Sequence, residues 1–347
     1  MNWTKKLMQW YAENKREFPW RNTKDPYKIW LSEIILQQTQ VQQGLPYYLR
    51  FVTTYPRVED LAEAAEEDVL KLWQGLGYYS RARNLLFSAH WVVNKNKGIF
   101  PKTFKGLMQL KGVGDYTASA IASICYDEFQ AVVDGNVYRF LSRYFGITTP
   151  IDSSIAHREF KARAMALMKG ESPGEFNQAL MEFGALQCTP KQPQCQRCPF
   201  LSSCLAYEQG KVASLPIKAK QVKTRKRFFN YLVLDLPSAK TILRKRAKKG
   251  IWQNLYEFPL IESPSLLNRK ELMAQKDFAQ WQTPAFSLPH LITPQPIKHL
   301  LSHQHLFIQF WHIKGQEEIK NALAQKELKN YPVPVVIQHF IDQHFFD

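Results

Sequence analysis

The chain has 347 residues, of which 45% are hydrophobic. This is enough for two globular domains with separate cores, and it excludes an intrinsically disordered chain. The 46 Lys and Arg against 30 Asp and Glu give a formal net charge of +16, which favours a polyanionic partner, nucleic acid ahead of a membrane surface. No apolar stretch approaches the length that crosses a bilayer, and the N-terminus lacks the pattern of a secretion signal. We expect an intracellular, cytoplasmic protein and, by default, a monomer.

The first 210 residues carry apolar side chains mostly at helical spacing, interrupted by Gly and Pro. This pattern predicts an all-helical domain over residues 1–210. Asp25 and Pro26 form a helix start, because Asp can cap a helix and Pro is preset for its first turn. One helix is therefore predicted from Tyr27 to about Gln42.

Glu33 lies inside the strongly apolar stretch 29–36 of that predicted helix. Most glutamates on helices are solvated surface residues. Large apolar neighbours on both sides should partly desolvate this one, which raises the pKa of a carboxyl group. Glu33 is therefore a candidate proton donor.

Two glycines, Gly112 and Gly114, stand in a short turn just before an Ala-rich helical stretch. Glycine lets the backbone come close to a partner, and the N-terminus of the following helix presents free N–H groups to a phosphate. Taken alone the pattern is weak evidence, since an ordinary turn between two helices explains it equally well.

Asp134 precedes a predicted helix over Asn136 to Phe145. It is placed to be a plain N-cap, and the same helix dipole would keep its carboxylate ionised. One protonated and one ionised carboxyl group is the arrangement that cleaves a glycosidic bond. The sequence alone does not bring Glu33 and Asp134 together.

Four of the five cysteines lie in one short window, at Cys188, Cys195, Cys198 and Cys204. Thiolates cluster in this way to hold a metal centre or to form disulfides, and disulfides need an oxidising compartment that no other feature supports. Structural zinc usually takes two separated pairs or mixes Cys with His, whereas four thiolates with unequal loops suit a [4Fe-4S] cluster. The spacing favours iron–sulfur and leaves zinc and disulfides as alternatives. Cys125, in an apolar run, is expected in the core.

Residues 211–227 contain seven basic and no acidic residues and are predicted to form an exposed, basic interdomain linker. Beyond them, residues 228–236 and 305–313 are rich in aromatic and branched side chains and read as strands of a smaller α+β domain over 228–347. His299, His303 and His305 alternate, which could indicate a metal site. Alternation on one strand more simply places the three on one partly solvated face.

The two-glycine turn, the aspartate that follows it and the four-cysteine loop together resemble the helix-hairpin-helix DNA glycosylases that carry an iron–sulfur cluster. Within that superfamily the chain looks most like the MutY-type adenine DNA glycosylases. The supporting segments are residues 18–21, 31–41, 75–84, 177–185, 250–259 and 299–306. The resemblance is dense over residues 3–205 and thinner beyond. It implies a multidomain α and α+β fold: a helical glycosylase domain, with a helix-hairpin-helix at about residues 105–125 and an iron–sulfur loop at 188–204, followed by a Nudix-like domain.

The resemblance also implies a base excision repair enzyme that removes adenine mispaired with 8-oxoguanine, and with guanine, from duplex DNA. Glu33 would protonate N7 of the flipped adenine and later help to activate water. Asp134 would stabilise the cationic sugar, and Tyr116 would support that site by hydrogen bonding. Such an adenine must leave the base stack before its glycosidic bond can be reached.

Further positions match residues with which the family contacts DNA or the damaged base. They are Arg21, Leu36, Gln37, Gln38, Thr39, Tyr78, Gly112, Gly114, Ser302 and His303. Gln38 and Tyr78 match residues wedged into the duplex, although Tyr78 could also be a packed loop aromatic. Ser302 and His303 match the family's damage-reading Phe-Ser-His loop, in which Leu301 here replaces the aromatic residue.

Tyr116 distinguishes this chain from the relatives that resemble endonuclease III. Those carry a lysine at this place, whose amine forms a Schiff base with the sugar and permits strand cleavage. Lys111 lies on the wrong side of the two glycines to substitute. We expect a monofunctional glycosylase that leaves an abasic site. The Nudix-like domain is not expected to be a hydrolase, because no acidic Nudix helix follows Gly250.

With the resemblance added, the four cysteines are expected to hold a [4Fe-4S] cluster that shapes a DNA-gripping loop with Lys191, Arg197 and Pro199 rather than performing chemistry. The expected partner is double-stranded DNA in the nucleoid, and repair or replication proteins could dock on the linker.

Two other functions are compatible with parts of the sequence. One is an inert DNA-binding protein, against which the intact pair Glu33 and Asp134 speaks. The other is a glycosylase for thymine opposite guanine, which would leave the second domain hard to explain.

Overall fold

The computed structural model describes residues 2–219 and 224–346. By its contacts the chain forms two compact units, one of Met1–Glu63 with Asn84–Gln221 and one of Ala64–Arg83 with Val222–Asp347. This division differs from the domains predicted from the sequence, because residues 64–83 group with the C-terminal part. No helix in the described part of the chain is long and apolar enough to span a membrane.

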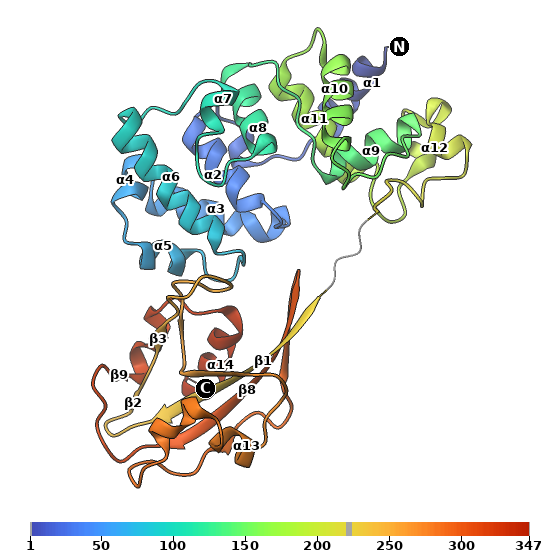
Figure 1. The fold of residues 1–347 in the computed structure, drawn as a ribbon. Coiled ribbons are helices and arrows are strands. Elements are labelled where there is room, and N and C mark those ends of the chain that lie inside the picture. The colour runs from blue at the N-terminus through green and yellow to red at the C-terminus, as the bar shows by residue number, and fades with distance from the viewer. Residues whose placement is uncertain (1, 220–223, 347) are drawn as a thin grey trace. The chain divides into compact units, whose positions relative to one another are not determined.

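The first unit is helical, as predicted (Figure 1). Its elements are α1 (Trp3–Asn14), η1 (Pro19–Arg21), α2 (Pro26–Leu36), α3 (Val41–Thr54), α4 (Val58–Glu63), most of α6 (Ser80–Asn96), α7 (Phe104–Leu107), α8 (Asp115–Tyr126), α9 (Gly135–Phe145), α10 (Ala156–Met168), α11 (Pro173–Leu186), η2 (Cys195–Arg197), η3 (Leu201–Ser203) and α12 (Leu205–Glu208). Helix α11 packs against α1, α8 and α9. Its Leu180 and Phe183 are fully buried, together with Phe160 of α10.

The prediction of one helix from Tyr27 to Gln42 is wrong. Asp25 does cap the helix, accepting a 2.9 Å hydrogen bond from the Tyr27 amide, but α2 ends at Leu36 and α3 starts only at Val41. Gln38 between them has φ +56°, a left-handed conformation that an α-helix does not admit. The apolar spacing continues across this corner, so the sequence pattern did not reveal it.

The second unit is built around a mixed sheet with the order β5-β1-β8-β6, in which β7 also pairs with β8. Its elements are α5 (Glu66–Leu72), β1 (Arg225–Asp235), β2 (Lys240–Thr241), β3 (Arg244–Lys245), β4 (Tyr256–Glu257), β5 (Leu260–Ser263), α13 (Arg269–Met273), η4 (Lys276–Trp281), β6 (His290–Leu291), β7 (Ile297–Leu301), β8 (Gln304–Lys314), β9 (Leu323–Ala324), η5 (Gln325–Asn330) and α14 (Val335–Phe345). The two predicted strands are confirmed as β1 and β8. They pair in parallel, with Phe228 opposite Phe307.

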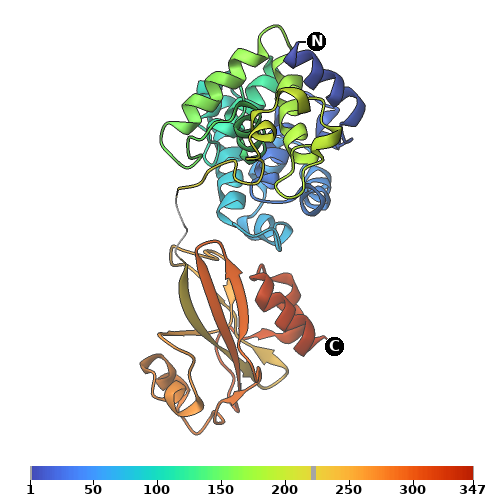
Figure 2. The ribbon, with the colours of Figure 1, turned by 90° about the vertical axis from the view of Figure 1, so that its right-hand side faces the viewer.

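Helices cover both faces of this sheet. On one face α14 lies along the strands (Figure 2), with the ring of Phe340 stacked 3.8 Å from that of Phe310 in β8. On the other face Leu272 and Phe278, from α13 and η4, pack with Leu232 of β1. The second unit therefore has its own core, as the α+β prediction required.

The three histidines do not share one face, contrary to the prediction. β7 and β8 form a hairpin that turns at Ser302 and His303, so His299 lies opposite Leu306 while His305 lies opposite Leu300. Adjacent pairs in an antiparallel ladder point to opposite faces of the sheet. The alternation of the histidines alone does not reveal this turn, although the family resemblance places Ser302 and His303 in a loop.

The predicted linker 211–227 is ordered over most of its length. Leu215 is buried and its carbonyl oxygen accepts a 3.1 Å hydrogen bond from Arg143, and the Ile217 carbonyl accepts one of 2.9 Å from the Ile151 amide. At the other end Arg225–Arg227 begin β1. Residues 220–223 of the prediction lie outside the described residues.

Candidate active site

A cavity of about 220 Å³ lies in the first unit. Glu33, Tyr116 and Asp134 all line it, although they come from α2, α8 and the start of α9. Leu36 and Thr39, two of the predicted DNA-contact residues, line it as well. Chain segments about 100 residues apart thus bring the two carboxyl groups to one site, the step that the sequence alone did not provide.

The environment of Glu33 makes its carboxyl group a weaker acid than an ordinary glutamate. Its helix neighbours Leu31, Ile34 and Ile35 are at most 2% exposed, which anchors α2 in the core with the carboxyl group directed to the cavity. Burial raises the pKa of Glu33 from 4.5 to about 7. A hydrogen bond with Tyr116 lowers this pKa, the charge of Asp134 raises it, and the charge of Arg21 lowers it. A carboxyl group with such a pKa is half protonated near neutral pH and can donate a proton.

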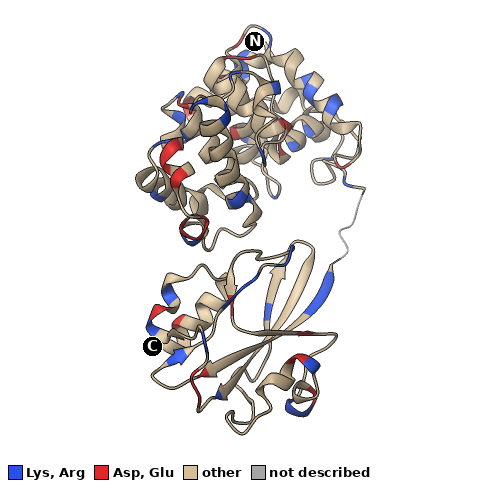
Figure 3. Cartoon of the chain, turned by 60° about the vertical axis from the view of Figure 1, so that its left-hand side comes forward, with Lys and Arg blue, Asp and Glu red and all other residues tan. Residues whose placement is uncertain are grey.

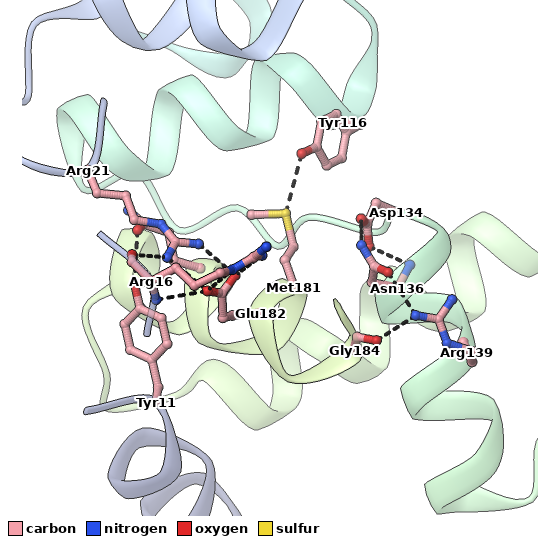
Figure 4. A network of polar contacts seen from close by, with 11 residues as sticks. Tyr11, Arg16, Arg21, Tyr116, Asp134, Asn136, Arg139, Met181, Glu182 and Gly184 are labelled. Carbon is pink, nitrogen blue, oxygen red and sulfur yellow. Dashed lines mark hydrogen bonds and ion pairs between the residues drawn. The ribbon is translucent and has the colours of Figure 1, made fainter. Parts of the chain in front are cut away.

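Asp134 caps helix α9. Its Oδ1 accepts hydrogen bonds from the amides of Asn136 at 2.9 Å and Val137 at 2.8 Å, and its Oδ2 accepts one of 2.8 Å from the Asn136 side chain (Figure 4). Burial raises the pKa of Asp134, and these three hydrogen bonds oppose the rise. The helix cap therefore favours the ionised carboxylate within a shielded site.

Tyr116 interacts with both carboxyl groups of the cavity. Its hydroxyl donates a 3.3 Å hydrogen bond to Sδ of Met181 (Figure 4) and also hydrogen-bonds with Glu33, while burial, followed by the charges of Glu33 and Asp134, raises its pKa well above the usual value. The phenol therefore stays neutral and serves as a hydrogen-bond donor.

No described residue that lines the cavity is a lysine. Lys111 is exposed in the turn before α8, where its Nζ lies 4.5 Å from the ring centroid of Phe87. An amine that could attack a sugar is therefore missing from the described lining of this cavity.

Glu182 is a cavity residue that the sequence interpretation missed. It is 2% exposed and binds Arg16 and Arg21 through Nη2–Oε2 contacts of 2.7 and 2.9 Å (Figure 4). Burial acts to raise its pKa, but hydrogen bonds from Arg16 and then Arg21 hold the pKa of Glu182 down at about 2. The signal was available, because a glutamate between Met181 and Phe183 falls on an apolar stretch of helix, as Glu33 does.

Arg21 was predicted to contact DNA or the damaged base. It lines the cavity, and besides Glu182 its Nη1 donates a 2.7 Å hydrogen bond to the Arg16 carbonyl oxygen. The guanidinium is thus held in a fixed position by protein acceptors, and its contact with a base stays a prediction.

The two-glycine turn leads into α8 as predicted. Gly112 has φ +83°, and a Cβ built on it would come within 3.0 Å of the Asn84 Cβ atom. Gly114 is the N-cap residue of α8. The Gln37 side chain, at the corner after α2, donates a 3.1 Å hydrogen bond to Thr117 Oγ1 and one of 3.4 Å to the Gly112 carbonyl. The corner that exposes Gln38 is therefore tied to the hairpin turn.

The remaining predicted DNA-contact residues lie in the second unit. Tyr78 is 48% exposed with φ +47°, and its hydroxyl is hydrogen-bonded to the Ser302 hydroxyl in the turn between β7 and β8. His303 is exposed in the same turn, and its carbonyl oxygen accepts a 3.0 Å hydrogen bond from the Arg225 amide. An exposed aromatic ring and the predicted damage-reading turn thus meet in one unit.

The four-cysteine loop folds around one small pocket. All four of its thiols line this pocket of about 30 Å³, together with Phe140, Phe183 and Phe200, and no described cysteine forms a disulfide. Arg143 Nη1 lies 3.5 Å from Sγ of Cys188. Within the described residues no group of three His, Cys, Asp or Glu side chains is spaced to hold a single metal ion. Four thiols around a mostly apolar pocket are a donor set that fits an iron–sulfur cluster.

Comparison with known proteins supports this arrangement. The family model of the HhH-GPD superfamily of base excision DNA repair proteins matches residues 31–164, and a NUDIX domain model matches residues 230–343. A solved structure of a thermostable thymine-DNA glycosylase has a TM-score of 0.56 at 31% identity, over 59% of this chain and 95% of that one. An endonuclease III–DNA complex has a TM-score of 0.53 at 21% identity, over 60% and 94%, and it supports the helical fold alone.

Relatives that align over both units are more informative. An adenine DNA glycosylase of Mus musculus is 35% identical over 88% of this chain and 69% of its own length. One of Buchnera aphidicola subsp. Schizaphis graminum is 35% identical over 73% of each chain. The fold class and the enzyme class expected from the sequence are confirmed. Both relatives are 35% identical to this chain over more than two thirds of their own length. The chain therefore belongs to the adenine DNA glycosylase family.

Proposed function

We propose that this protein removes adenine paired with 8-oxoguanine, and with guanine, from double-stranded DNA by hydrolysing the N-glycosidic bond. The observation that carries the proposal is the cavity shared by Glu33, Tyr116 and Asp134, in which the pKa of Glu33 is raised to about 7. A cavity with one proton donor and one capped carboxylate suits a base that has been flipped out of the duplex.

Glu33 would act first, by protonating N7 of the adenine so that the base leaves as a neutral molecule. The proton is available because burial keeps this carboxyl group partly neutral at pH 7. As the bond to C1′ breaks, positive charge develops on the sugar, and the carboxylate of Asp134 would stabilise it. The ionised Glu33 would then accept a proton from the attacking water. Tyr116 would hold Glu33 in place by its hydrogen bond.

The product would be an intact strand with an abasic site. Strand cleavage through a Schiff base needs an amine beside C1′, and the described cavity lining contains none. Tyr116 occupies the place at which the family resemblance puts the lysine of bifunctional relatives.

The second unit would read the base opposite the adenine. Ser302 and His303 lie at the tip of the β7–β8 hairpin, and Tyr78 is hydrogen-bonded to Ser302. Tyr78 and Gln38 would enter the duplex where the adenine has left, with Arg21, Leu36, Gln37 and Thr39 near the damaged base and Gly112 and Gly114 at the DNA backbone. Leu301 beside Ser302 would supply apolar contact without an aromatic ring.

The cofactor would be a [4Fe-4S] cluster held by Cys188, Cys195, Cys198 and Cys204. When bound, the cluster would crosslink residues 188–204 into a fixed loop. Lys191 and Arg197, both exposed in this loop, would then face DNA phosphates, a contact that weakens with salt. The proposed reaction itself needs only Glu33, Asp134 and Tyr116.

The test uses duplexes that carry adenine opposite 8-oxoguanine, adenine opposite guanine, and thymine opposite guanine. Strand breaks are compared with and without hot alkali. Breaks that appear only after alkali, and only with the two adenine substrates, are expected. Breaks without alkali would indicate a lyase, release of thymine would support the activity named for the solved thymine-DNA glycosylase, and no breaks with tight binding would indicate an inert DNA-binding protein.

A further inference from the structure

Helix α5 carries three acidic residues in its first turn, Glu66, Glu67 and Asp68; Figure 3 colours the acidic residues of the described chain red and the basic ones blue. Two of them bind the hairpin formed by β3 and β4 in the same unit. The Glu67 carboxylate accepts hydrogen bonds of 2.8 Å from Lys245 Nζ and from the Tyr256 hydroxyl, and Glu66 accepts one from the side chain of Asn254. Residues 178 to 189 positions apart in the chain are thus joined by a compact polar contact.

The segment after α5 is held by the same unit. Lys71 Nζ donates a 3.2 Å hydrogen bond to the Tyr331 carbonyl oxygen, and the Gln74 amide donates one of 2.7 Å to Gln338 of α14. At its far end Arg83 donates a 2.8 Å hydrogen bond to the Gln253 carbonyl in the β3–β4 hairpin. Within the second unit, residues 64–83 are therefore bound to the C-terminal part of the chain at both ends.

The loop between these anchors has little freedom of its own. Gly75, Gly77 and Tyr78 have φ of +98°, +71° and +47°, and the Gly77 carbonyl oxygen accepts a 3.0 Å hydrogen bond from the indole of Trp73. The buried guanidinium of Arg81 donates to the carbonyl oxygens of Leu76 and Gly77. A loop braced in this way follows the helix that carries it, so the position of α5 determines the position of Tyr78.

The β3–β4 hairpin also touches the predicted damage-reading hairpin. Trp252 lies between β3 and β4. Its ring centroid is 5.7 Å from that of His299 in β7 and 6.0 Å from that of Phe229 in β1. At the other end of the connection Tyr78 is hydrogen-bonded to Ser302. The β3–β4 hairpin therefore contacts both α5, which precedes the Tyr78 loop, and β7, which precedes the turn at Ser302.

We infer that Glu67 is a positioning residue for lesion recognition: by binding Lys245 and Tyr256 it sets Tyr78 against Ser302, so that tyrosine and serine meet the base opposite adenine as one preformed element. This inference rests on the proposed function, in which that base is 8-oxoguanine. In this inference the β3–β4 hairpin of the Nudix-like domain positions a recognition residue and takes no part in metal-dependent hydrolysis.

The Glu67 carboxylate is suited to this role because it stays ionised at neutral pH. Hydrogen bonds from Lys245 and then Tyr256 lower the pKa of Glu67. Both partners are partly exposed, with 43% of the Glu67 and 42% of the Lys245 side chain accessible, so the contact is of the kind whose loss changes an equilibrium by a few-fold. An effect of this size alters discrimination between two bases without unfolding the unit.

The experiment measures binding of the full-length protein to duplexes in which a non-cleavable 2′-fluoro adenosine stands opposite 8-oxoguanine or opposite guanine. Glu67→Ala is expected to reduce the ratio of the two affinities about fivefold, since two contacts of modest strength are lost. Asp68→Ala is the matched control, because it removes a carboxylate from the same helix turn that is exposed and has no hydrogen-bond partner among the described residues. The exchange Glu67→Lys with Lys245→Glu should restore most of the ratio.

If Glu67 had a purely structural role, Glu67→Ala would lower the stability of the protein and both DNA affinities together. The ratio of the two affinities would then stay unchanged, and the exchanged pair would have no ratio to restore. An unchanged ratio in Glu67→Ala, with the wild-type preference intact, would overturn the inference and leave the proposed function standing. A wild-type protein that showed no preference for 8-oxoguanine would refute the proposed specificity itself, and this would be visible before any variant is made.

Discussion

Replacing Glu33 by glutamine removes a titrating group from the cavity and keeps its shape, so the stability difference between the two proteins should depend on pH. Burial raises the pKa of Glu33 from 4.5 to about 7 in the folded protein. Between these values the unfolded chain releases the proton while the folded one keeps it, and the wild type therefore loses stability as the pH rises through this window. A shift of this size corresponds to about 3 kcal/mol, at 1.36 kcal/mol per pKa unit.

The assay is urea unfolding of both proteins between pH 4.5 and pH 8, followed by far-ultraviolet circular dichroism, which reports mainly on the helical first unit. Glu33→Gln should gain about 3 kcal/mol relative to the wild type across this range. Glu13→Gln, at an exposed carboxyl group of α1, is the control and should show a difference that does not change with pH.

The same variant should bind duplex DNA but release no adenine, since glutamine cannot donate the proton. In the wild type the rate of adenine release should fall as the pH rises through about 7, because Glu33 then ionises. A stability difference that stayed constant from pH 4.5 to pH 8 would refute the argument that burial raises this pKa, and a variant with wild-type turnover would refute the assignment of the acid.

Three further predictions concern the surroundings of the site. Gly112→Ala should destabilise the protein by about 1–3 kcal/mol and lower its thermal midpoint, since an alanine is strained at φ +83° and its Cβ meets Asn84. Gly114→Ala is the control and should leave the thermal midpoint almost unchanged, because its Cβ meets no described atom within 4 Å. Cys198→Ser should lower the iron and sulfide content of the purified protein, whereas Cys125→Ser should retain both, and equal content in the two variants would contradict the proposed ligands. Glu182→Gln should cost about 3 kcal/mol in urea unfolding at pH 7, because it leaves two arginines without their shared carboxylate; a variant of wild-type stability would show that the arginines find other acceptors.

The chemically unusual residues were predictable from the sequence, because their residue types conflict with their local pattern. A glutamate inside an apolar helix must be paired or protonated. That reasoning identified Glu33, the pKa of which burial raises to about 7, and it would have identified Glu182 had it been applied to α11. Asp134 was found as a helix cap and Gly112 as a turn residue from local rules of the same kind.

What depends on distant contacts was not predictable. The corner at Gln38 was missed because the apolar spacing of α2 continues into α3, and the turn at His303 was missed because two strands joined by a tight turn repeat the alternation of one. The grouping of residues 64–83 with the second unit depends on partners such as Lys245 and Tyr256, which lie far along the chain. A single sequence contains no signal for pairings of this range.

The order in which the chain is made gives the grouping of residues 64–83 a consequence for folding. During synthesis this segment leaves the ribosome while its partners, from Lys245 to Gln338, are still unmade. Domains fold largely in the order of their synthesis, so the helices that enclose the cavity can assemble while α5 and the Tyr78 loop still await their neighbours. A chain cut short after the first unit would keep the residues of the cavity, yet it would carry a loop that never reaches its final place. Nascent or truncated chains should accordingly be cut by proteases first within residues 64–83.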